Sequence, residues 1–142
     1  MQTILRSRVI IINDEKVFCV KHSKDSPYWA LPGGKMEGRE SPLECIKREI
    51  KEELDVTIEK EPELVYVARW FNEKKNEDNL EFIFLIEDDK NFLELKNENG
   101  THAFEIVEMN YFSRNEDFVL LPEIIEQDFR ENKIEKDKVR FI

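Results

Sequence analysis

Cysteine and histidine are both scarce in this chain of 142 residues, which holds two of each. Cys19 and Cys45 have no metal-like spacing and are too few for a disulfide framework, so we expect two reduced thiols. His22 stands alone in a polar stretch, where a histidine is more often exposed than catalytic. Folding must therefore rest on a hydrophobic core, for which a chain of this length is sufficient.

Long apolar runs are also missing. The run at residues 9–12 is far shorter than the roughly 20 residues that a membrane-spanning helix requires. Met1 is not followed by a charged segment and an apolar segment of the kind found in signal peptides. We therefore expect a cytoplasmic protein without a membrane partner.

Positive charge is in deficit, since 22 Lys and Arg residues face 32 Asp and Glu residues and the net charge is −10. Such a balance argues against a surface that follows a nucleic-acid backbone, and we expect no nucleic-acid partner. A small phosphorylated ligand remains compatible with it, provided that a metal ion supplies positive charge locally.

The most informative stretch covers residues 29–58. Pro32, Gly33 and Gly34 end an apolar run and predict a turn at which a ligand can approach the main chain. Ser41 and Glu44 then form the pattern of a capping box, and the proline between them suits the first position of a helix. The sequence therefore predicts a glycine turn followed at once by a well-defined helix start.

The predicted helix has two stripes. One is apolar and suited to packing, because its members recur at spacings of three and four residues: Leu43, Ile46, Ile50 and Leu54. The other consists of Glu49, Glu52 and Glu53, whose charges repel one another. A hard divalent cation would turn that repulsion into binding, whereas the alternative is an ordinary solvated acidic face.

The rest of the chain predicts a mixture of strands and one further helix. Runs rich in β-branched and aromatic residues predict strands at 3–12, 16–21, 56–58, 64–71, 80–86, 104–112 and 139–142. The first two should form a hairpin across Asn13 and Asp14, and 64–71 should pair with 80–86. A helix is expected at 121–130, and charged stretches at 71–79 and 88–100 are expected to be loops. We find no repeat or linker, so residues 1–142 are expected to form a single domain.

The order of residues from Gly34 onward resembles the Nudix box, the signature of Nudix hydrolases. The box reads as glycine, five residues, glutamate, seven residues, Arg-Glu, an aliphatic residue, any residue, Glu-Glu, any residue, glycine and an aliphatic residue. In this chain it spans 34–56, with Gly34, Glu40, Arg48, Glu49, Ile50, Glu52, Glu53, Asp55 and Val56 at the fixed positions.

Two positions depart from the usual box. Asp55 replaces its last glycine, and Arg39 separates Gly38 from Glu40, where the glycine more often directly precedes the glutamate. The replaced glycine belongs to the helix end, where aspartate also visits the left-handed conformation at moderate cost. We therefore expect the first departure to affect stability rather than chemistry.

This resemblance implies a Nudix fold, an α/β/α sandwich around a mixed β-sheet. It also implies metal-dependent hydrolysis of a diphosphate bond in a nucleoside diphosphate linked to another group. The form is similar to the MutT-like group, whose substrates include nucleoside triphosphates, and the expected cofactor is Mg²⁺, with Mn²⁺ as a substitute. The alternative is a catalytically silent nucleotide sensor or interaction module, which would normally have lost box glutamates.

The resemblance also assigns roles to residues. Glu49 and Glu53 are the implied metal ligands, with Glu52 next and the carbonyl of Gly34 as a further candidate. Arg48 and Glu40 are expected to pair and, with Gly33, to support the site. Candidates for the general base are Glu53 within the box and Glu105 in a later strand, with Glu98 and Glu108 as competitors for the second position.

Substrate selectivity is less determined by the sequence. Tyr28, Trp29, Trp70 and Phe71 are candidates for stacking on a base, although aromatic residues in strand patterns are more often part of the core. The implied partner is a small nucleotide-type substrate. A homodimer is compatible with the resemblance, but no stretch of the sequence indicates an interface.

Overall fold

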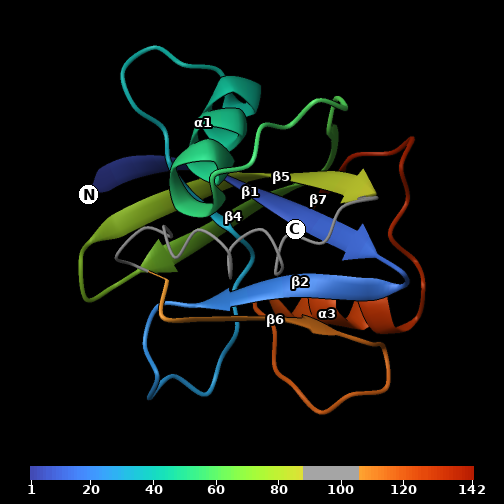
Figure 1. Cartoon of the computed structure of the whole chain (residues 1–142). Coiled ribbons are helices and arrows are strands. Elements are labelled where there is room, and N and C mark those ends of the chain that lie inside the picture. The colour runs from blue at the N-terminus through green and yellow to red at the C-terminus, as the bar shows by residue number, and fades with distance from the viewer. Residues whose placement is uncertain (88–105) are drawn as a thin grey trace.

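The computed structural model describes residues 1–87 and 106–142 (Figure 1). Within them the chain forms seven strands and two helices, in the order β1 (Gln2–Asn13), β2 (Lys16–Lys21), β3 (Gly33–Lys35), α1 (Pro42–Leu54), β4 (Glu63–Asn72), β5 (Glu77–Glu87), β6 (Glu108–Phe112), α3 (Glu123–Arg130) and β7 (Arg140–Phe141). The loop predicted at 88–100 lies outside the described residues, as do the first two residues of the strand predicted at 104–112.

All seven strands join one mixed sheet, in the order β6-β2-β1-β5-β4-β7, with β3 attached to β1. β1 runs parallel to β5 along their whole lengths, and β5 is antiparallel to β4, as predicted. The other edge of β1 is divided between two partners. β3 pairs with Arg6, Ser7 and Arg8, whereas β2 pairs only with Ile12 and Asn13 before turning to β6.

One helix covers each face of the sheet (Figure 1). Side chains alternate along a strand, so β1 sends Val9 and Ile11 toward α1 and Ile10 toward α3. The apolar stripe of α1 packs on the first face, and α3 contributes Ile125 and Phe129 to the core on the second. The predicted α/β/α sandwich is confirmed, and neither described helix is long and apolar enough to cross a membrane.

The ends of α1 are formed as the sequence predicts. Ser41 Oγ accepts a hydrogen bond from the backbone N–H of Glu44 at 3.1 Å, and the Glu44 carboxylate accepts one from the backbone N–H of Ser41 at 2.9 Å. At the other end Asp55 adopts the left-handed conformation, with φ 55° and ψ 36°. This helix is therefore held at both ends by local interactions.

The glycine pair is not the predicted turn but the start of strand β3. Gly33 has φ +148°, and a Cβ atom there would lie 2.1 Å from the carbonyl oxygen of Ser7. Only glycine allows the two backbones to approach so closely. The turn prediction was wrong because glycine served here for close strand contact, and the chain turns later, in the loop 36–41.

Other sequence predictions need smaller corrections. Residues 56–58 form no strand. Val56 is instead buried in the same core cluster as the apolar stripe of α1. The hairpin of β1 and β2 is paired only at its tip, where Asp14 and Glu15 have positive φ values. The second helix begins at Glu123, after Pro122, instead of at residue 121.

Candidate functional site

Arg48, on α1, ties the loop 36–41 to the helix. Its Nε and Nη2 donate to the two carboxylate oxygens of Glu40 at 3.0 and 2.7 Å, and Nη2 also donates to the carbonyl of Lys35 at 3.0 Å. The predicted contact between Arg48 and Glu40 is therefore present. The hydrogen bonds from Arg48 lower the pKa of Glu40 to about 2, so this carboxylate stays charged through the neutral range.

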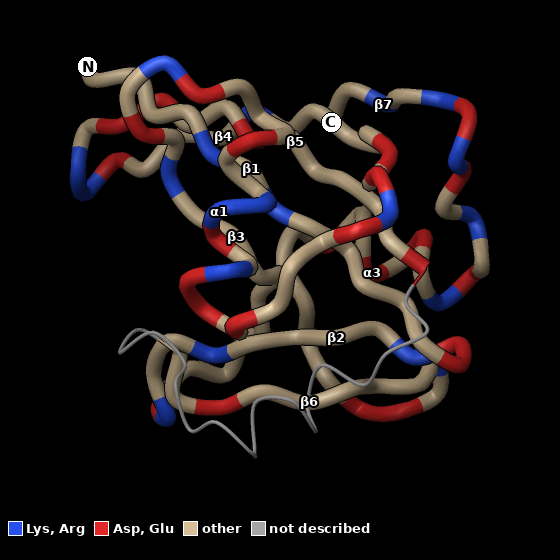
Figure 2. Tube along the Cα trace, turned by 45° about the horizontal axis from the view of Figure 1, so that its top comes forward, with Lys and Arg blue, Asp and Glu red and all other residues tan. Residues whose placement is uncertain are grey.

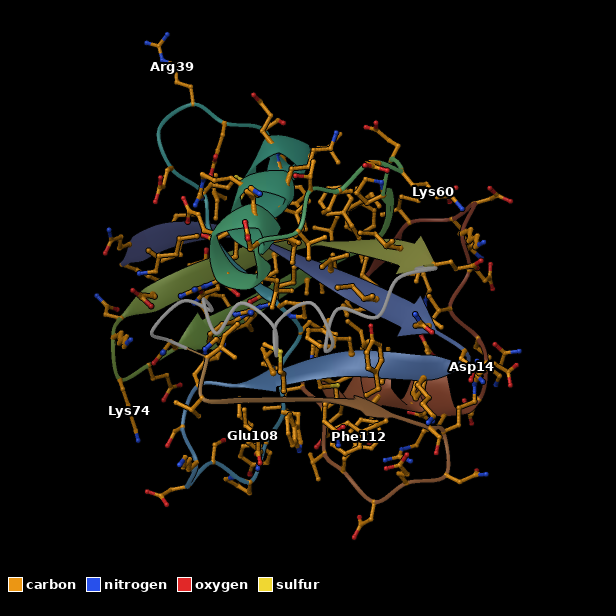
Figure 3. All side chains as sticks on the ribbon, viewed as in Figure 1. Asp14, Arg39, Lys60, Lys74, Glu108 and Phe112 are labelled. Carbon is orange, nitrogen blue, oxygen red and sulfur yellow. The ribbon has the colours of Figure 1, made fainter. Side chains whose placement is uncertain are left out.

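The remaining nitrogen of Arg48, Nη1, lies close to three further carboxylates. Nη1 lies 3.1 Å from an oxygen of Glu49 and 3.1 Å from an oxygen of Glu52, while Glu37 is 3.7 Å away. One guanidinium thus faces four carboxylates, which we call the Arg48 cluster (Glu37, Glu40, Glu49 and Glu52). Figure 2 shows acidic and basic segments side by side along α1 and the loop before it. Arg39, at the loop tip, points away from the molecule and is exposed (Figure 3).

Gly34 makes room for one member of this cluster. A Cβ atom at Gly34 would lie 2.5 Å from Glu49 Oε1 and 2.8 Å from Glu49 Oε2. The Glu49 carboxylate therefore rests directly against the backbone of β3. The carbonyl of Gly34 accepts a hydrogen bond from Cys45 Sγ at 3.7 Å, and burial raises the pKa of that thiol to about 11, so it remains a neutral donor.

The other residues predicted to bind the metal or to act as the base do not form a cluster like the one around Arg48 in the described part of the chain. Glu53 is buried, with 3% of its surface exposed, whereas Glu52 is exposed. Glu105 and its competitor Glu98 lie outside the described residues, and Glu108 is paired with Lys21 at 3.8 Å. Within residues 1–87 and 106–142, no three acidic, histidine or cysteine side chains are arranged to hold a metal ion.

The chemistry of the donors nevertheless fits one kind of group. Glu49 and Glu52 present oxygens to the same point, now taken by Arg48 Nη1, and the Gly34 backbone touches Glu49. Carboxylate and carbonyl oxygens are the ligands of Mg²⁺ and similar hard cations. The donor set therefore suits a divalent cation of that class.

The aromatic candidates occupy three different environments. Trp29 is half-buried, packs edge-on against Phe112 with ring centres 4.9 Å apart, and has Lys21 Nζ 4.7 Å from its ring centre. Tyr28 is 50% exposed. Trp70 differs from both, because it borders a cavity.

This cavity has a volume of about 510 Å³ and lies on the α3 side of the sheet. We name it the Arg8–Glu81 cavity after an ion pair in its wall, which also contains the charged residues Arg69 and Glu123. The other lining residues are Ala30, Ala68, Trp70, Leu121, Pro122, Ile124 and Ile142. Arg8 Nε donates to Glu81 Oε1 at 3.2 Å, and Arg8 Nη1 donates to the carbonyl of Leu31 at 2.9 Å. The sequence analysis missed both residues, although charged residues at alternate positions of an apolar strand are a usable signal.

β3 connects the cavity to the Arg48 cluster. Gly33 is the partner of Arg8 in the sheet, and the next residue, Gly34, is the partner of Ser7 and touches Glu49. One residue of β3 thus adjoins the cavity wall and the next adjoins the carboxylates. The cavity and the cluster are thus next to successive residues of the same strand.

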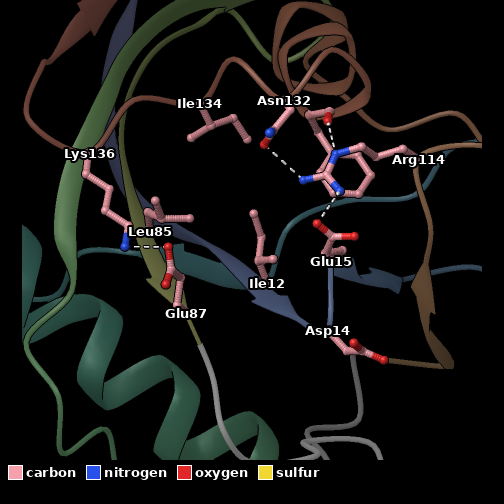
Figure 4. Close-up of a pocket in the computed structure, with 10 residues that line it drawn as sticks. Ile12, Asp14, Glu15, Leu85, Glu87, Arg114, Asn132, Ile134 and Lys136 are labelled. Atoms are coloured by element: carbon pink, nitrogen blue, oxygen red, sulfur yellow. Dashed lines mark hydrogen bonds and ion pairs between the residues drawn. The ribbon is translucent and has the colours of Figure 1, made fainter.

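A second cavity, of about 410 Å³, lies on the same side of the sheet at the ends of β1 and β5 (Figure 4). Its wall holds two ion pairs, Arg114 with Glu15 at 3.8 Å and Lys136 with Glu87, and Arg114 also donates to Asn132 at 3.1 Å. Figure 4 shows Lys136 and Glu87 on one side of the cavity and Arg114 with Glu15 and Asn132 on the other. We call it the Arg114–Glu87 cavity.

A mixed sheet between two helices, with a capped carboxylate-rich helix over a glycine strand, defines the class of protein. The family profile described as NUDIX domain matches residues 3–127. The chain therefore belongs to the Nudix family, as its box predicts, and it is a Nudix hydrolase by class.

Several solved structures have a fold similar to that of this chain. A MutT NUDIX hydrolase from Burkholderia pseudomallei has a TM-score of 0.69 at 18% identity, over 90% of this chain and 98% of that one. A mutator MutT protein from Bacillus halodurans has a TM-score of 0.67 at 22% identity, over 96% and 86%. An ADP-ribose pyrophosphatase from Streptococcus suis has a TM-score of 0.60 at 18% identity, over 98% of both. At these identities the similarity concerns the fold alone, and curated sequences gave no match.

Proposed function

We propose that this protein hydrolyses a diphosphate bond in a nucleoside diphosphate linked to another group, with nucleoside triphosphates as the first candidates. The observation that carries this proposal is the Arg48 cluster beside the glycine strand, one residue of β3 away from the wall of a cavity with an aromatic side. A nucleotide has the matching division into a flat apolar base and an anionic phosphate chain.

Glu49, Glu52, Glu53 and the carbonyl of Gly34 are the residues that would hold a divalent cation, Mg²⁺ or Mn²⁺. When bound, this cation supplies the positive charge that neutralises phosphate oxygens and acidifies a water molecule. Without it the site carries an excess of negative charge and would repel a diphosphate. The acidic site and an anionic substrate are thus compatible only through a cation.

The protein's own side chains position these groups. Arg48 holds Glu49 and Glu52 through one nitrogen, and its two hydrogen bonds to Glu40 fix the guanidinium against the loop. A carboxylate is also required to take the proton from the attacking water, and Glu53 and Glu105 are the candidates. Trp70 is 39% exposed and lines the Arg8–Glu81 cavity, so it supports a stacked base better than the half-buried Trp29.

The experiment that tests this proposal measures phosphate or pyrophosphate release from a panel of substrates. The panel contains nucleoside triphosphates, nucleotide sugars, ADP-ribose and dinucleoside polyphosphates, each with Mg²⁺, with Mn²⁺ and with a chelator. We expect cleavage of one class that requires a divalent cation. Cleavage that persists with the chelator, or no cleavage of any class by folded protein that binds the cation, would overturn the proposal.

A further inference from the structure

Two positively charged side chains lie opposite each other where β1 pairs with β3. Arg6 and Lys35 are direct partners in this antiparallel register, so their side chains leave the sheet on the same face. Like charges directly opposite each other in a sheet are destabilising. Within the described residues neither side chain forms an ion pair. An anion bound between them would convert this repulsion into attraction.

Arg6 is held in one orientation and has donors to spare. Its Nε donates to Asn79 Oδ1 at 2.9 Å, whereas Nη1 and Nη2 have no acceptor in residues 1–87 and 106–142. Asn79, on β5, is fully buried, and its Nδ2 likewise has no acceptor in that part of the chain. Arg6, Lys35 and Asn79 thus contribute an excess of donors, which suits a ligand rich in acceptor oxygens.

The charge of the surroundings also favours an anion. The register of β1 with β5 places three further charged residues on this face, Arg8, Glu77 and Glu81. Arg8 and Glu81 pair with each other at 3.2 Å. Arg6 and Lys35 then face one buried carboxylate, that of Glu77, whose Oε1 has no donor among the described residues. The local charge is therefore positive, although the whole chain carries −10.

This pair of charges stands next to the Arg48 cluster. Lys35 follows Gly34, whose backbone touches Glu49, and the Lys35 carbonyl accepts a hydrogen bond from Arg48 at 3.0 Å. β3 has β1 as its one partner among the described strands, so no further strand separates the two faces of the sheet at this edge. Successive residues of β3 thus adjoin the proposed cation ligands and the two positive side chains.

We propose that Arg6 and Lys35, together with Asn79, bind phosphate oxygens of the substrate that the cation does not bind. A guanidinium presents paired donors to a phosphate, and a lysine adds a point charge. The inference rests on the proposed function, since it takes a diphosphate as the ligand. It adds anion-binding residues on β1 and β5 that lie outside the box.

The test uses imidodiphosphate, in which an N–H group replaces the bridging oxygen and prevents hydrolysis. Calorimetry measures its binding in the presence of Mg²⁺, and a separate titration measures the binding of Mn²⁺ alone. We expect Arg6→Gln and Lys35→Gln each to weaken imidodiphosphate binding by about 10-fold, as for a lost charge-assisted hydrogen bond. Affinity for Mn²⁺ alone should stay within about twofold of wild type, because these side chains act on the anion.

Two further variants distinguish this role from a structural one. Glu77→Gln should strengthen imidodiphosphate binding, because it removes the nearby negative charge with almost no change in volume. Lys35→Gln should keep or raise the melting temperature of the free protein, because the repulsion between Arg6 and Lys35 is relieved. Arg39→Gln is the matched control, since it removes one exposed positive charge from the loop after β3, and it should bind imidodiphosphate as wild type does.

The inference would be overturned if the wild-type protein with Mg²⁺ did not bind imidodiphosphate, or if folded Arg6→Gln and Lys35→Gln bound it as tightly as wild type. An equal loss in Arg39→Gln, or an equal loss of Mn²⁺ binding, would also contradict it. If Arg6→Gln does not fold, Lys35→Gln and Glu77→Gln carry the test. Binding that depends on these residues without hydrolysis of any substrate would contradict the proposed function and leave the anion site standing.

Discussion

The two described helices each carry one arginine, and the two arginines have opposite surroundings. Arg130, on α3, donates to the backbone carbonyls of Arg114, Glu116 and Phe118 at 2.7–2.9 Å, and it meets one carboxylate, Glu126, at 3.2 Å. Arg48, on α1, meets the four carboxylates of the Arg48 cluster and one carbonyl. Arg130 therefore holds the segment 114–118 against α3, whereas Arg48 faces more negative charges than it can neutralise.

This difference indicates where the molecule gives up stability for function. Around Arg130 the charges balance, and each contact fastens residues 114–118 to α3. Around Arg48 the carboxylates outnumber the one positive charge, and this excess of negative charge disfavours the folded state unless the proposed cation is bound. Natural sequences depart from locally consistent design mainly at functional sites, and α1 fits that pattern whereas α3 does not. The predictions below are ordered by expected effect.

Glu53→Gln should give the largest loss of activity. The substitution removes the charge of a proposed metal ligand or base with almost no change in volume, so we expect the rate of cation-dependent hydrolysis to fall by at least about 100-fold. The fold should persist, which circular dichroism and thermal denaturation would check. Glu61→Gln, an exposed isosteric control, should keep full activity. Retained turnover in Glu53→Gln would remove Glu53 from the site.

Arg130→Met should have the reverse profile, with stability lost and chemistry kept. Three charge-assisted hydrogen bonds to carbonyls disappear, and we expect the free energy of unfolding to fall by roughly 2–3 kcal/mol. Urea denaturation gives this value, and activity per folded molecule should equal wild type. Arg69→Met removes an exposed pair with Asp78 and should cost less than about 1 kcal/mol. Equal losses in the two variants would contradict the structural role of Arg130.

The contact between Arg48 and Glu40 should appear as a pH dependence. Arg48 lowers the pKa of Glu40 from 4.5 to about 2, so the folded state binds the proton less readily than the unfolded state. The contribution of Glu40 to stability is then complete above about pH 4.5 and is lost as the pH falls toward 2. The difference in unfolding free energy between wild type and Glu40→Gln should shrink across this window. A difference that is constant with pH would contradict the assignment.

Asp55→Gly should have the smallest effect. Glycine relieves the strain of a left-handed residue but gains freedom in the unfolded chain and loses the contact of Asp55 with Lys51 at 2.9 Å. We expect the melting temperature to rise slightly or stay unchanged. Asp55→Ala should instead be destabilised by about 1–2 kcal/mol, because alanine tolerates this conformation poorly. A large loss in Asp55→Gly would show an additional role for Asp55.

Local signals predicted the parts of the fold that local interactions form. The capping box at Ser41, the left-handed Asp55 and the pairing of Arg48 with Glu40 all depend on residues close in the chain, and all are present. β3 was missed because its glycines suggested a turn, although they permit close contact with Ser7, 26 residues earlier. Arg8 and Glu81 were missed because they are 73 residues apart and only the sheet register brings them together.

The long separation between β1 and β5 also governs how this chain is made. β1 pairs in parallel with β5, from Gln2 opposite Glu77 to Ile12 opposite Glu87. Each residue of β1 is therefore synthesised about 75 residues before its partner in β5. Such non-local pairing slows folding and leaves an apolar strand edge open meanwhile. During translation the chain must keep β1 from pairing with other chains until β5 has left the ribosome, and destabilised variants should therefore be lost first to aggregation of nascent chains.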